Sequence, residues 1–492
     1  MAFGDLAANL TTGGLFLLMA AAAFVGTSGV AAVLFFGGRL MARLTFAAFL
    51  KRLLTDPYLD NLLEVLSTTA KVGPAVILET SLRAEEGRAL NRPFGTRHQL
   101  PHFDRLRFDF AQLDTFPTPG DQEVDLRTVI GPQAARPLTL DFPVMIAPMA
   151  YGLALSGPVK VALAKGAALA GTASATGEGP FFPAEREAAR YLVVQYGRSP
   201  WTQLPAVVRQ GDAVELEVGS GARGGLGTVE PPDVLDENLR TLMGIPPGQA
   251  AMAPARFSGL ATVDDLRQLI GELRELTGGV PVGVKLSAGA HLEDDLALVA
   301  EAGADFVTVG GAQAGTWQSP LSLQDDFGVP TLYALARAAR FLDREGLRGR
   351  MSLIIGGNLR TPGEFLKAVA LGADAVYIGT VALLALVHTQ VLKTLPGLPP
   401  TQLIGYRAKL GGRFDQREAV RSLANFLVSC REEMGEGLRA LGKTSLSQLT
   451  REDLMAVDPV TARACGVRPA YRPARSSATP RRRATNPPPG IP

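Results

Sequence analysis

The chain has 492 residues, of which 47% are hydrophobic and 20% charged, and its formal net charge is +2. A chain of this length can bury one large core or two moderate ones, and so small a net charge gives no reason to expect nucleic acid as a partner. The two cysteines, Cys430 and Cys465, exclude a disulfide framework and a Cys-rich zinc site. His98 and His102 are four residues apart, but Pro101 between them argues against a chelating helix, so no metal site is predicted.

The first predicted element is a membrane anchor at residues 1–38. No residue from Leu6 to Gly38 is charged, and this stretch exceeds the roughly 20 apolar residues that cross a bilayer. Four basic residues follow within residues 39–52, and the only charged side chain before it is Asp5. The positive-inside rule therefore predicts a single-pass membrane protein that contacts lipid through this helix, with its N-terminus outside and its catalytic domain in the cytoplasm. A buried core helix is the alternative.

The rest of the chain divides into four segments by composition. Residues 39–95 have apolar positions at helical spacing and are expected to be membrane-proximal helices. A Pro-rich lead-in opens the main domain at 96–395, and a helical C-terminal extension follows at 396–467. The Pro, Arg and Ser content of residues 468–492 predicts a disordered basic tail.

Eight short, mostly β-branched runs recur through the main domain. They lie at residues 143–148, 170–175, 191–196, 213–218, 281–286, 305–310, 352–357 and 375–380. Most are separated by stretches of helical period, and the longer interval at 219–280 contains an insertion as well as a helix. Eight strands alternating with helices over about 240 residues predict an α/β fold, a (β/α)₈ TIM barrel, in preference to a doubly wound sheet.

In such a barrel the functional residues lie in the loops that follow the strands. Most of these loops begin with glycine or another small residue, which lets backbone approach a flat ligand closely. Gly356 and Gly357 follow the seventh strand, and Gly379 and Thr380 follow the eighth. These positions predict a phosphate site, because backbone N–H groups and a helix N-terminus bind anions there.

Two charged residues stand out among the strand ends. Glu178 lies between Gly177 and Gly179, which predicts a lone carboxylate on a flexible backbone. Lys285 ends an apolar strand, so its ammonium is expected in the barrel mouth. It either forms a salt bridge, for example to Glu178, or places a fixed positive charge beside a cofactor ring such as a reduced flavin.

With these loops in place, the sequence resembles the FMN-binding domain of glutamate synthase, in particular its stand-alone, membrane-anchored relatives. The resemblance covers residues 90–467 and is carried by segments such as "APMAYGLALS", "GTASATGEGP" and "LIIGGNLRTPGEFLKAVALGADAVYIGT". It implies an FMN enzyme that passes electrons to the imine formed from 2-oxoglutarate and ammonia, giving glutamate.

The resemblance also implies the positions of the site residues. FMN would lie over Pro148, Met149 and Ala150, with Thr176, Gln195 and Lys285 near its ring and its phosphate on Gly311, Gly356, Gly357, Gly379 and Thr380. Glu178 would face flavin and substrate, and Glu178 and Lys285 are the expected catalytic residues.

The sequence departs from the family pattern in several places, and two of them bear on the cofactors and the substrate. The family has a cysteine-rich cluster-binding stretch after strand eight, whereas this chain reads "LVHTQVLKTLPGLPP". We therefore expect no iron–sulfur cluster and no electron delivery from ferredoxin by that route. The family's Q-G-A-K-P-G loop appears here with Ser220 and Arg223 in place of its Gln and Lys, and these two are the expected substrate contacts because arginine can clamp a carboxylate.

The leading hypothesis is a membrane-anchored, FMN-dependent oxidoreductase of glutamate synthase type. Its substrate would be a small anionic 2-oxo acid or amino acid, and a partner subunit would donate electrons or supply ammonia. The alternatives are an FMN barrel dehydrogenase of other specificity coupled to membrane quinone, and a degenerate flavin-binding membrane scaffold.

Overall fold

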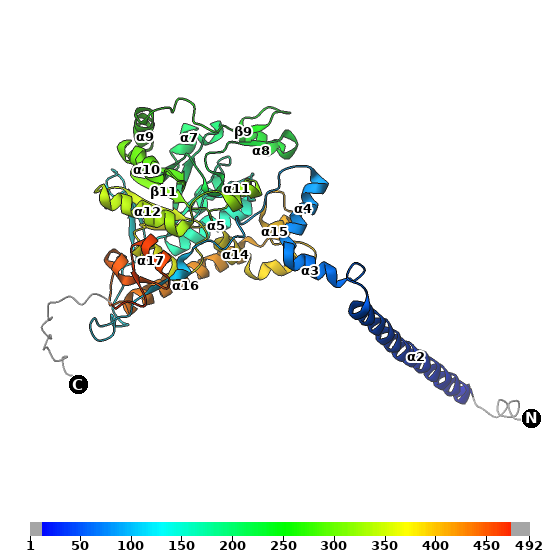
Figure 1. Cartoon of the computed structure of the whole chain (residues 1–492). Coiled ribbons are helices and arrows are strands. Elements are labelled where there is room, and N and C mark those ends of the chain that lie inside the picture. The colour runs from blue at the N-terminus through cyan, green and yellow to red at the C-terminus, as the bar shows by residue number, and fades with distance from the viewer. Residues whose placement is uncertain (1–11, 474–492) are drawn as a thin grey trace, which may run out of the picture. The chain divides into compact units, whose positions relative to one another are not determined.

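The computed structural model describes residues 12–473 (Figure 1). The chain forms two compact units, divided after Leu90, and each is described by itself. The first contains the helices α2 (Thr12–Thr55), α3 (Leu63–Val72) and α4 (Pro74–Glu86).

Helix α2 is long and apolar enough to cross a membrane, and its most apolar window has no buried side chain. Its 44 residues correspond to a length of about 66 Å. The helix continues past residue 38, where we expected the anchor to end, because the five residues that follow Gly38 are all strong helix formers and neither glycine has a positive φ.

The second unit contains one parallel sheet of eight strands in the order β4-β13-β12-β11-β10-β7-β6-β5. The strands are β4 (Val144–Ile146), β5 (Ala173–Ala175), β6 (Tyr191–Tyr196), β7 (Ala213–Glu217), β10 (Val282–Ser287), β11 (Phe306–Gly310), β12 (Ser352–Gly356) and β13 (Ala375–Ile378). Every pairing between them is parallel. The sheet curls into a nearly closed barrel, which confirms the predicted fold class.

Each barrel strand is followed by at least one helix, as the alternating sequence pattern predicted. These helices are α5 (Gly157–Ala170), α6 (Pro183–Ala188), α7 (Pro205–Val208), α9 (Val263–Thr277), α10 (Leu292–Glu301), α11 (Leu321–Asp326) with α12 (Thr331–Arg344), α13 (Pro362–Ala370) and α14 (Thr380–Val387). Helix α9 begins with a capping box between Thr262 and Asp265, which satisfies backbone donors of its first turn.

A hairpin from the lead-in closes the N-terminal end of the barrel. Its strands are β2 (Thr128–Ile130) and β3 (Leu138–Leu140), and their apolar side chains pack in one cluster with inward-facing barrel residues such as Phe306. At the turn, a Cβ on Gly131 would lie 2.6 Å from the side chain of Pro281, just before β10. The ligand site is therefore confined to the carboxyl ends of the strands.

The C-terminal segment packs on the barrel wall. Helix α16 (Gln416–Ala440) lies against α5, where a Cβ on Gly166 would come within 2.8 Å of Leu423. The remaining elements here are α15 (Thr401–Ile404), α17 (Pro459–Cys465) and a small sheet of β1 (Leu106–Phe108), β14 (Leu454–Ala456) and β15 (Arg468–Pro469). Strand β15 takes the first residues of the segment expected to be a disordered tail, and residues 474–492 of that segment lie outside the described part of the chain.

The expected insertion between β7 and α9 forms a short hairpin and a helix. Its elements are β8 (Thr228–Glu230), α8 (Glu237–Met243) and β9 (Ala251–Ala253). Leu239 of α8 packs in one cluster with Tyr151 and Trp201, which follow β4 and β6. The insertion thus covers loops at the carboxyl end of the barrel.

Candidate functional site

A cavity of about 490 Å³ lies at the carboxyl ends of the barrel strands. All eight strands contribute to its lining, either directly or through the loop that follows. Among the residues expected in the site, the lining includes Pro148, Met149, Ala150, Glu178, Gln195, Ser220, Arg223, Lys285, Gly356, Gly357, Gly379 and Thr380.

Two of the expected residues, Thr176 and Gly311, do not line the cavity. The Thr176 hydroxyl accepts a hydrogen bond from the backbone N–H of Gln195 at 3.0 Å. A Cβ on Gly311 would lie 2.3 Å from Oγ1 of Thr331 and 2.4 Å from its Cα. Gly311 therefore allows β11 to pack closely against the start of α12.

Gly356, the last residue of β12, and Gly379, which follows β13, leave open space inside the cavity, whereas a Cβ on Gly357 would lie 2.2 Å from Oγ1 of Thr331. A Cβ on Gly356 would meet Tyr377 at 3.5 Å and one on Gly379 would meet Ala147 at 3.8 Å, both ordinary contact distances. Protein packing therefore does not require glycine at either position. Gly379 is also the N-cap of α14, so backbone N–H groups of the first turn are available to an anion.

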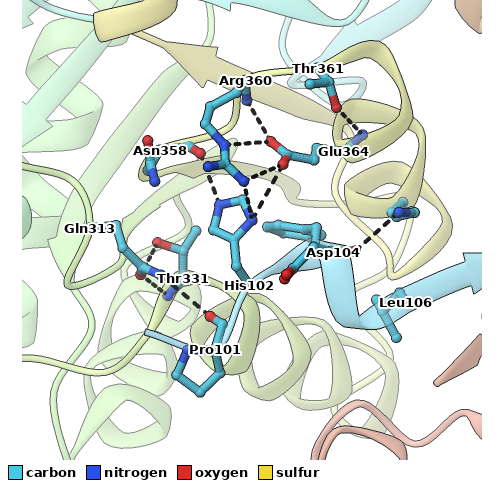
Figure 2. A network of polar contacts seen from close by, with 12 residues as sticks. Pro101, His102, Asp104, Leu106, Gln313, Thr331, Asn358, Arg360, Thr361 and Glu364 are labelled. Carbon is cyan, nitrogen blue, oxygen red and sulfur yellow. Dashed lines mark hydrogen bonds and ion pairs between the residues drawn. The ribbon is translucent and has the colours of Figure 1, made fainter. Parts of the chain in front are cut away.

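A buried histidine from the lead-in supports the loop that follows β12 (Figure 2). Nε2 of His102 lies 2.9 Å from the carbonyl oxygen of Asn358, and its Nδ1 lies 3.5 Å from Glu364 and 3.4 Å from Arg360. Glu364 accepts hydrogen bonds from the backbone N–H and the guanidinium of Arg360, both at 2.7 Å. Burial and the charge of Arg360 lower the pKa of His102, although the negative charge of Glu364 raises it. The ring is therefore neutral and donates its Nε2–H to the carbonyl oxygen of Asn358.

The glycines on either side of Glu178 serve close packing, which corrects the expectation of a flexible backbone. Gly177 has a φ of 78°, and a Cβ there would lie 2.6 Å from the backbone nitrogen of Ala150. A Cβ on Gly179 would lie 2.2 Å from the carbonyl oxygen of Tyr151. The indole N–H of Trp201 donates to the Glu178 carbonyl at 2.8 Å, so the loop is fixed against its neighbours.

Beneath this loop lies a buried ion pair that the sequence analysis missed. Lys160 of α5 contacts Glu185 of α6 at 2.8 Å and donates to the carbonyl oxygens of Ala175 and Thr176 at 3.0 and 3.1 Å. Burial raises the pKa of Glu185 to about 7, although Lys160 opposes the shift. The pair connects two helices to the strand end that carries Glu178.

Glu178 forms its ion pair with Arg223, and Arg223 also contacts a second carboxylate. Nη2 of Arg223 reaches Oε1 of Glu178 and lies 2.9 Å from Oε1 of Glu217, the last residue of β7. Burial raises the pKa of Glu217, and the neighbouring charge of Glu178 raises it further. The expected pairing of Glu178 with Lys285 is therefore replaced by a contact with Arg223.

Lys285 instead forms its ion pair with Glu215 on the adjacent strand β7. Its Nζ lies 3.8 Å from Oε1 of Glu215, whose Oε2 accepts a hydrogen bond from the Thr308 hydroxyl at 2.7 Å. Burial raises the pKa of Glu215 despite the nearby ammonium. Lys285 thus lines the cavity, and its ammonium forms an ion pair with Glu215, which is fully buried.

Comparison with known proteins identifies the family to which the chain belongs. Residues 88–444 match the family described as "Conserved region in glutamate synthase". The chain belongs to this glutamate synthase family. It is 35% identical over 385 residues to a "Glutamate synthase large subunit-like protein" of Rhizobium meliloti, covering 74% of this chain and 87% of that protein.

Two further comparisons describe the range of similar proteins. An "Archaeal-type glutamate synthase [NADPH]" of Thermotoga neapolitana is 34% identical over 341 residues, and the match covers 69% of this chain and only 66% of that protein. Among solved structures, the flavin-binding domain of baker's yeast flavocytochrome b2 is similar at a TM-score of 0.48 and 18% identity, over 79% of this chain and 84% of that chain.

For this glutamate synthase family member, sequence reasoning missed the interior acids Glu215 and Glu217. The two residues are separated by one position in "AVELEV", so both side chains project from the same face of a strand. In a barrel that face is either the interior or the helix layer. A pair of acids between buried apolar residues was the available signal that they line a polar interior.

Proposed function

We propose that the chain is an FMN-dependent oxidoreductase of glutamate synthase type, which reductively aminates 2-oxoglutarate or a related 2-oxo acid to the amino acid. The observation that carries the proposal is the composition of one cavity. It combines Gly356 and Gly379, which leave open space in the cavity, with the charged side chains of Lys285 and Glu178. Family membership supports the reaction type.

The residues present fit FMN. A phosphate fits the space beside Gly356 and Gly379, at the start of α14. Protein atoms do not fill the space that a side chain at either position would occupy. Gln195 lines the cavity with a buried Oε1 that has no hydrogen-bond partner among the described residues, so its side-chain amide is available to a ring edge. When bound, FMN supplies hydride-transfer chemistry, and the protein supplies its position and surrounding charges.

The remaining roles follow from the charges. Lys285 places a positive charge in the cavity and is held by Glu215. Glu178 lines the cavity with its side chain 15% exposed, so its carboxylate is placed to exchange a proton with the substrate nitrogen. We propose Ser220 and Arg223 as substrate contacts, with a small anionic 2-oxo acid or amino acid as the ligand.

We further propose that α2 anchors the protein in a membrane, with the barrel in the cytoplasm. Its length, its exposed apolar surface and the basic residues in its second half support this arrangement. An electron-donating or ammonia-supplying subunit would complete the reaction. Retention of the full chain in the membrane fraction after an alkaline carbonate wash tests the anchor, and release into the supernatant would contradict it.

The decisive experiment measures reoxidation of bound flavin in the full-length protein, purified in mild detergent. The flavin is reduced without oxygen, and its absorption is followed after addition of 2-oxoglutarate with ammonium. We expect rapid reoxidation by the pair and none by 2-oxoglutarate alone. Reoxidation by quinone but not by the pair would favour the membrane-quinone dehydrogenase, and failure to bind FMN would reject both.

Glu178→Gln separates binding from catalysis in the same assay. The variant keeps the shape of the side chain, so FMN content should be unchanged. Turnover should fall by roughly 100-fold or more, the usual contribution of a positioned acid or base. Glu187→Gln, an exposed change on α6, is the matched control and should retain full activity.

A further inference from the structure

Two carboxylates share one guanidinium nitrogen at the base of the cavity. Glu178 and Glu217 come from different loops and strands, yet both contact Nη2 of Arg223. The Glu178 side chain is 15% exposed and lines the cavity, whereas the Glu217 side chain is 1% exposed. Glu178 is therefore the outer member of the pair and Glu217 the inner one.

The charges around this pair do not balance when all carboxyl groups are ionised. The charged groups that face Glu217 are Glu178, Arg223 and Lys285, with Glu215 two residues earlier on its own strand. Three carboxylates thus face two cations. An uncompensated buried charge costs several kcal/mol, on the order of the penalty that makes buried acids retain a proton.

The surroundings of the two inner acids indicate which carboxyl groups hold that proton. Each leaves one buried oxygen without a hydrogen-bond partner among the described residues, Oε1 of Glu215 and Oε2 of Glu217. Oε1 of Glu215 lies 3.8 Å from the ammonium of Lys285 and its Oε2 accepts a hydrogen bond from Thr308, whereas Glu217 shares Nη2 of Arg223 with the negative charge of Glu178. A proton shared between Glu217 and Glu178 removes the excess charge beside a cation that both already contact.

We propose that Glu178 and Glu217 share one proton, and that Glu217 stores the proton which Glu178 delivers to the substrate nitrogen. The delivery step rests on the proposed function, whereas the shared proton does not. The O–H bond of Glu217 breaks as that of Glu178 forms, and Glu178 then protonates the imine nitrogen. The two electrons enter at the imine carbon as hydride from the proposed cofactor, and water reprotonates the pair. Glu217 thus acts through Glu178.

Infrared difference spectroscopy of the full-length protein in detergent tests the shared proton without any turnover. At neutral pH, wild type should show the C=O band of a protonated carboxyl that is absent from Glu217→Gln. Glu178→Gln should lose the band as well, because two carboxylates then face two cations and Glu217 ionises. A band that persists in Glu217→Gln and disappears in Glu215→Gln would place the proton on Glu215 and overturn the proposal.

The pH dependence of turnover tests the delivery step. In Glu217→Gln we expect turnover to fall by roughly 100-fold with a changed pH profile, while FMN content and substrate KM stay within about 3-fold of wild type. An unchanged profile, with the infrared band lost, would overturn delivery. Absence of turnover in wild type would reject the proposed function and the delivery step with it, while the infrared result still decides whether the proton is shared.

Discussion

His102 and Asn358 are 256 residues apart in the sequence, yet Nε2 of His102 lies 2.9 Å from the carbonyl oxygen of Asn358. Asn358 has a φ of 57°, in the left-handed region that non-glycine residues rarely adopt. Its conformation is therefore held by a residue of the lead-in, outside the barrel. Because Asn358 follows Gly357 directly, this contact controls the shape of the proposed phosphate site.

His102→Ala should weaken FMN binding and destabilise the barrel. It removes the hydrogen bond to the Asn358 carbonyl, a loss of about 0.5–1.5 kcal/mol. FMN titration and chemical unfolding of the full-length protein measure the two effects. His98→Ala is the matched control, because His98 is exposed and only four residues away. Equal effects of the two substitutions would show that the contact with Asn358 has no special role.

Gly379→Ala and Gly311→Ala should fail in different ways. A methyl group at 379 meets only Ala147 at 3.8 Å, so the protein should fold with near-normal stability and bind FMN at least tenfold more weakly. A methyl group at 311 overlaps backbone and side-chain atoms of Thr331, so it should destabilise the fold by about 1–3 kcal/mol. Melting temperature and FMN affinity distinguish the outcomes, and normal FMN affinity in Gly379→Ala would place the phosphate elsewhere.

Lys285→Met should lower the midpoint potential of bound FMN. Loss of a nearby positive charge disfavours the more negative, reduced form of the flavin. A decrease on the order of 30 mV corresponds to about 1.4 kcal/mol for a two-electron couple. Spectroelectrochemistry of the full-length protein measures it, with the exposed Lys165→Met of α5 as control. An unchanged potential would remove Lys285 from the ring environment.

The buried pair of Lys160 and Glu185 should make stability depend on pH. Burial raises the pKa of Glu185 from 4.5 to about 7, so the folded state favours the protonated acid. This contribution is fully present below pH 4.5 and is lost as the pH rises through about 7. Between pH 5 and pH 8 the contribution of Glu185 to the free energy of unfolding should fall by on the order of 3 kcal/mol.

The measurement compares wild type with Glu185→Gln, which cannot ionise at this position. Urea unfolding at both pH values should show that the free energy of unfolding of wild type, relative to the variant, decreases as the pH rises. The opposite trend would mean that the ionised pair is the stabilising form. Glu187→Gln on the same helix should leave the pH dependence unchanged.

The fold could be predicted because each strand and helix of the barrel has a recognisable pattern within its own short segment of the sequence. Each strand is a short apolar run such as "YLVVQY", and each following helix has its own period. The strand-end positions of Lys285, Gly356 and Gly379 followed from that rhythm alone. The contact between β1 and β14 could not be predicted, because it joins segments more than 300 residues apart without a local signal.

The polar partners of the site residues depend on three-dimensional arrangement. Arg223 returns to Glu217 because the residues after β7 fold into a short 3₁₀ turn, which composition does not reveal. Lys285 pairs with Glu215 because β10 lies beside β7 in the sheet. The strand order thus decides which acid contacts which base. The strand-end positions alone suggested Glu178 as an example of a partner for Lys285, and the structure has Glu215 instead.

The two ends of the sheet order, β4 and β5, have a mechanical consequence. No hydrogen-bond ladder joins them among the described strands, and the loops that follow press together instead, with Gly177 against Ala150. Side-chain and loop packing resist separation less cooperatively than a ladder does. This part of the wall, directly beside Met149 and Glu178, therefore depends on the close fit of those two loops, whereas seven strand pairings hold the rest of the wall.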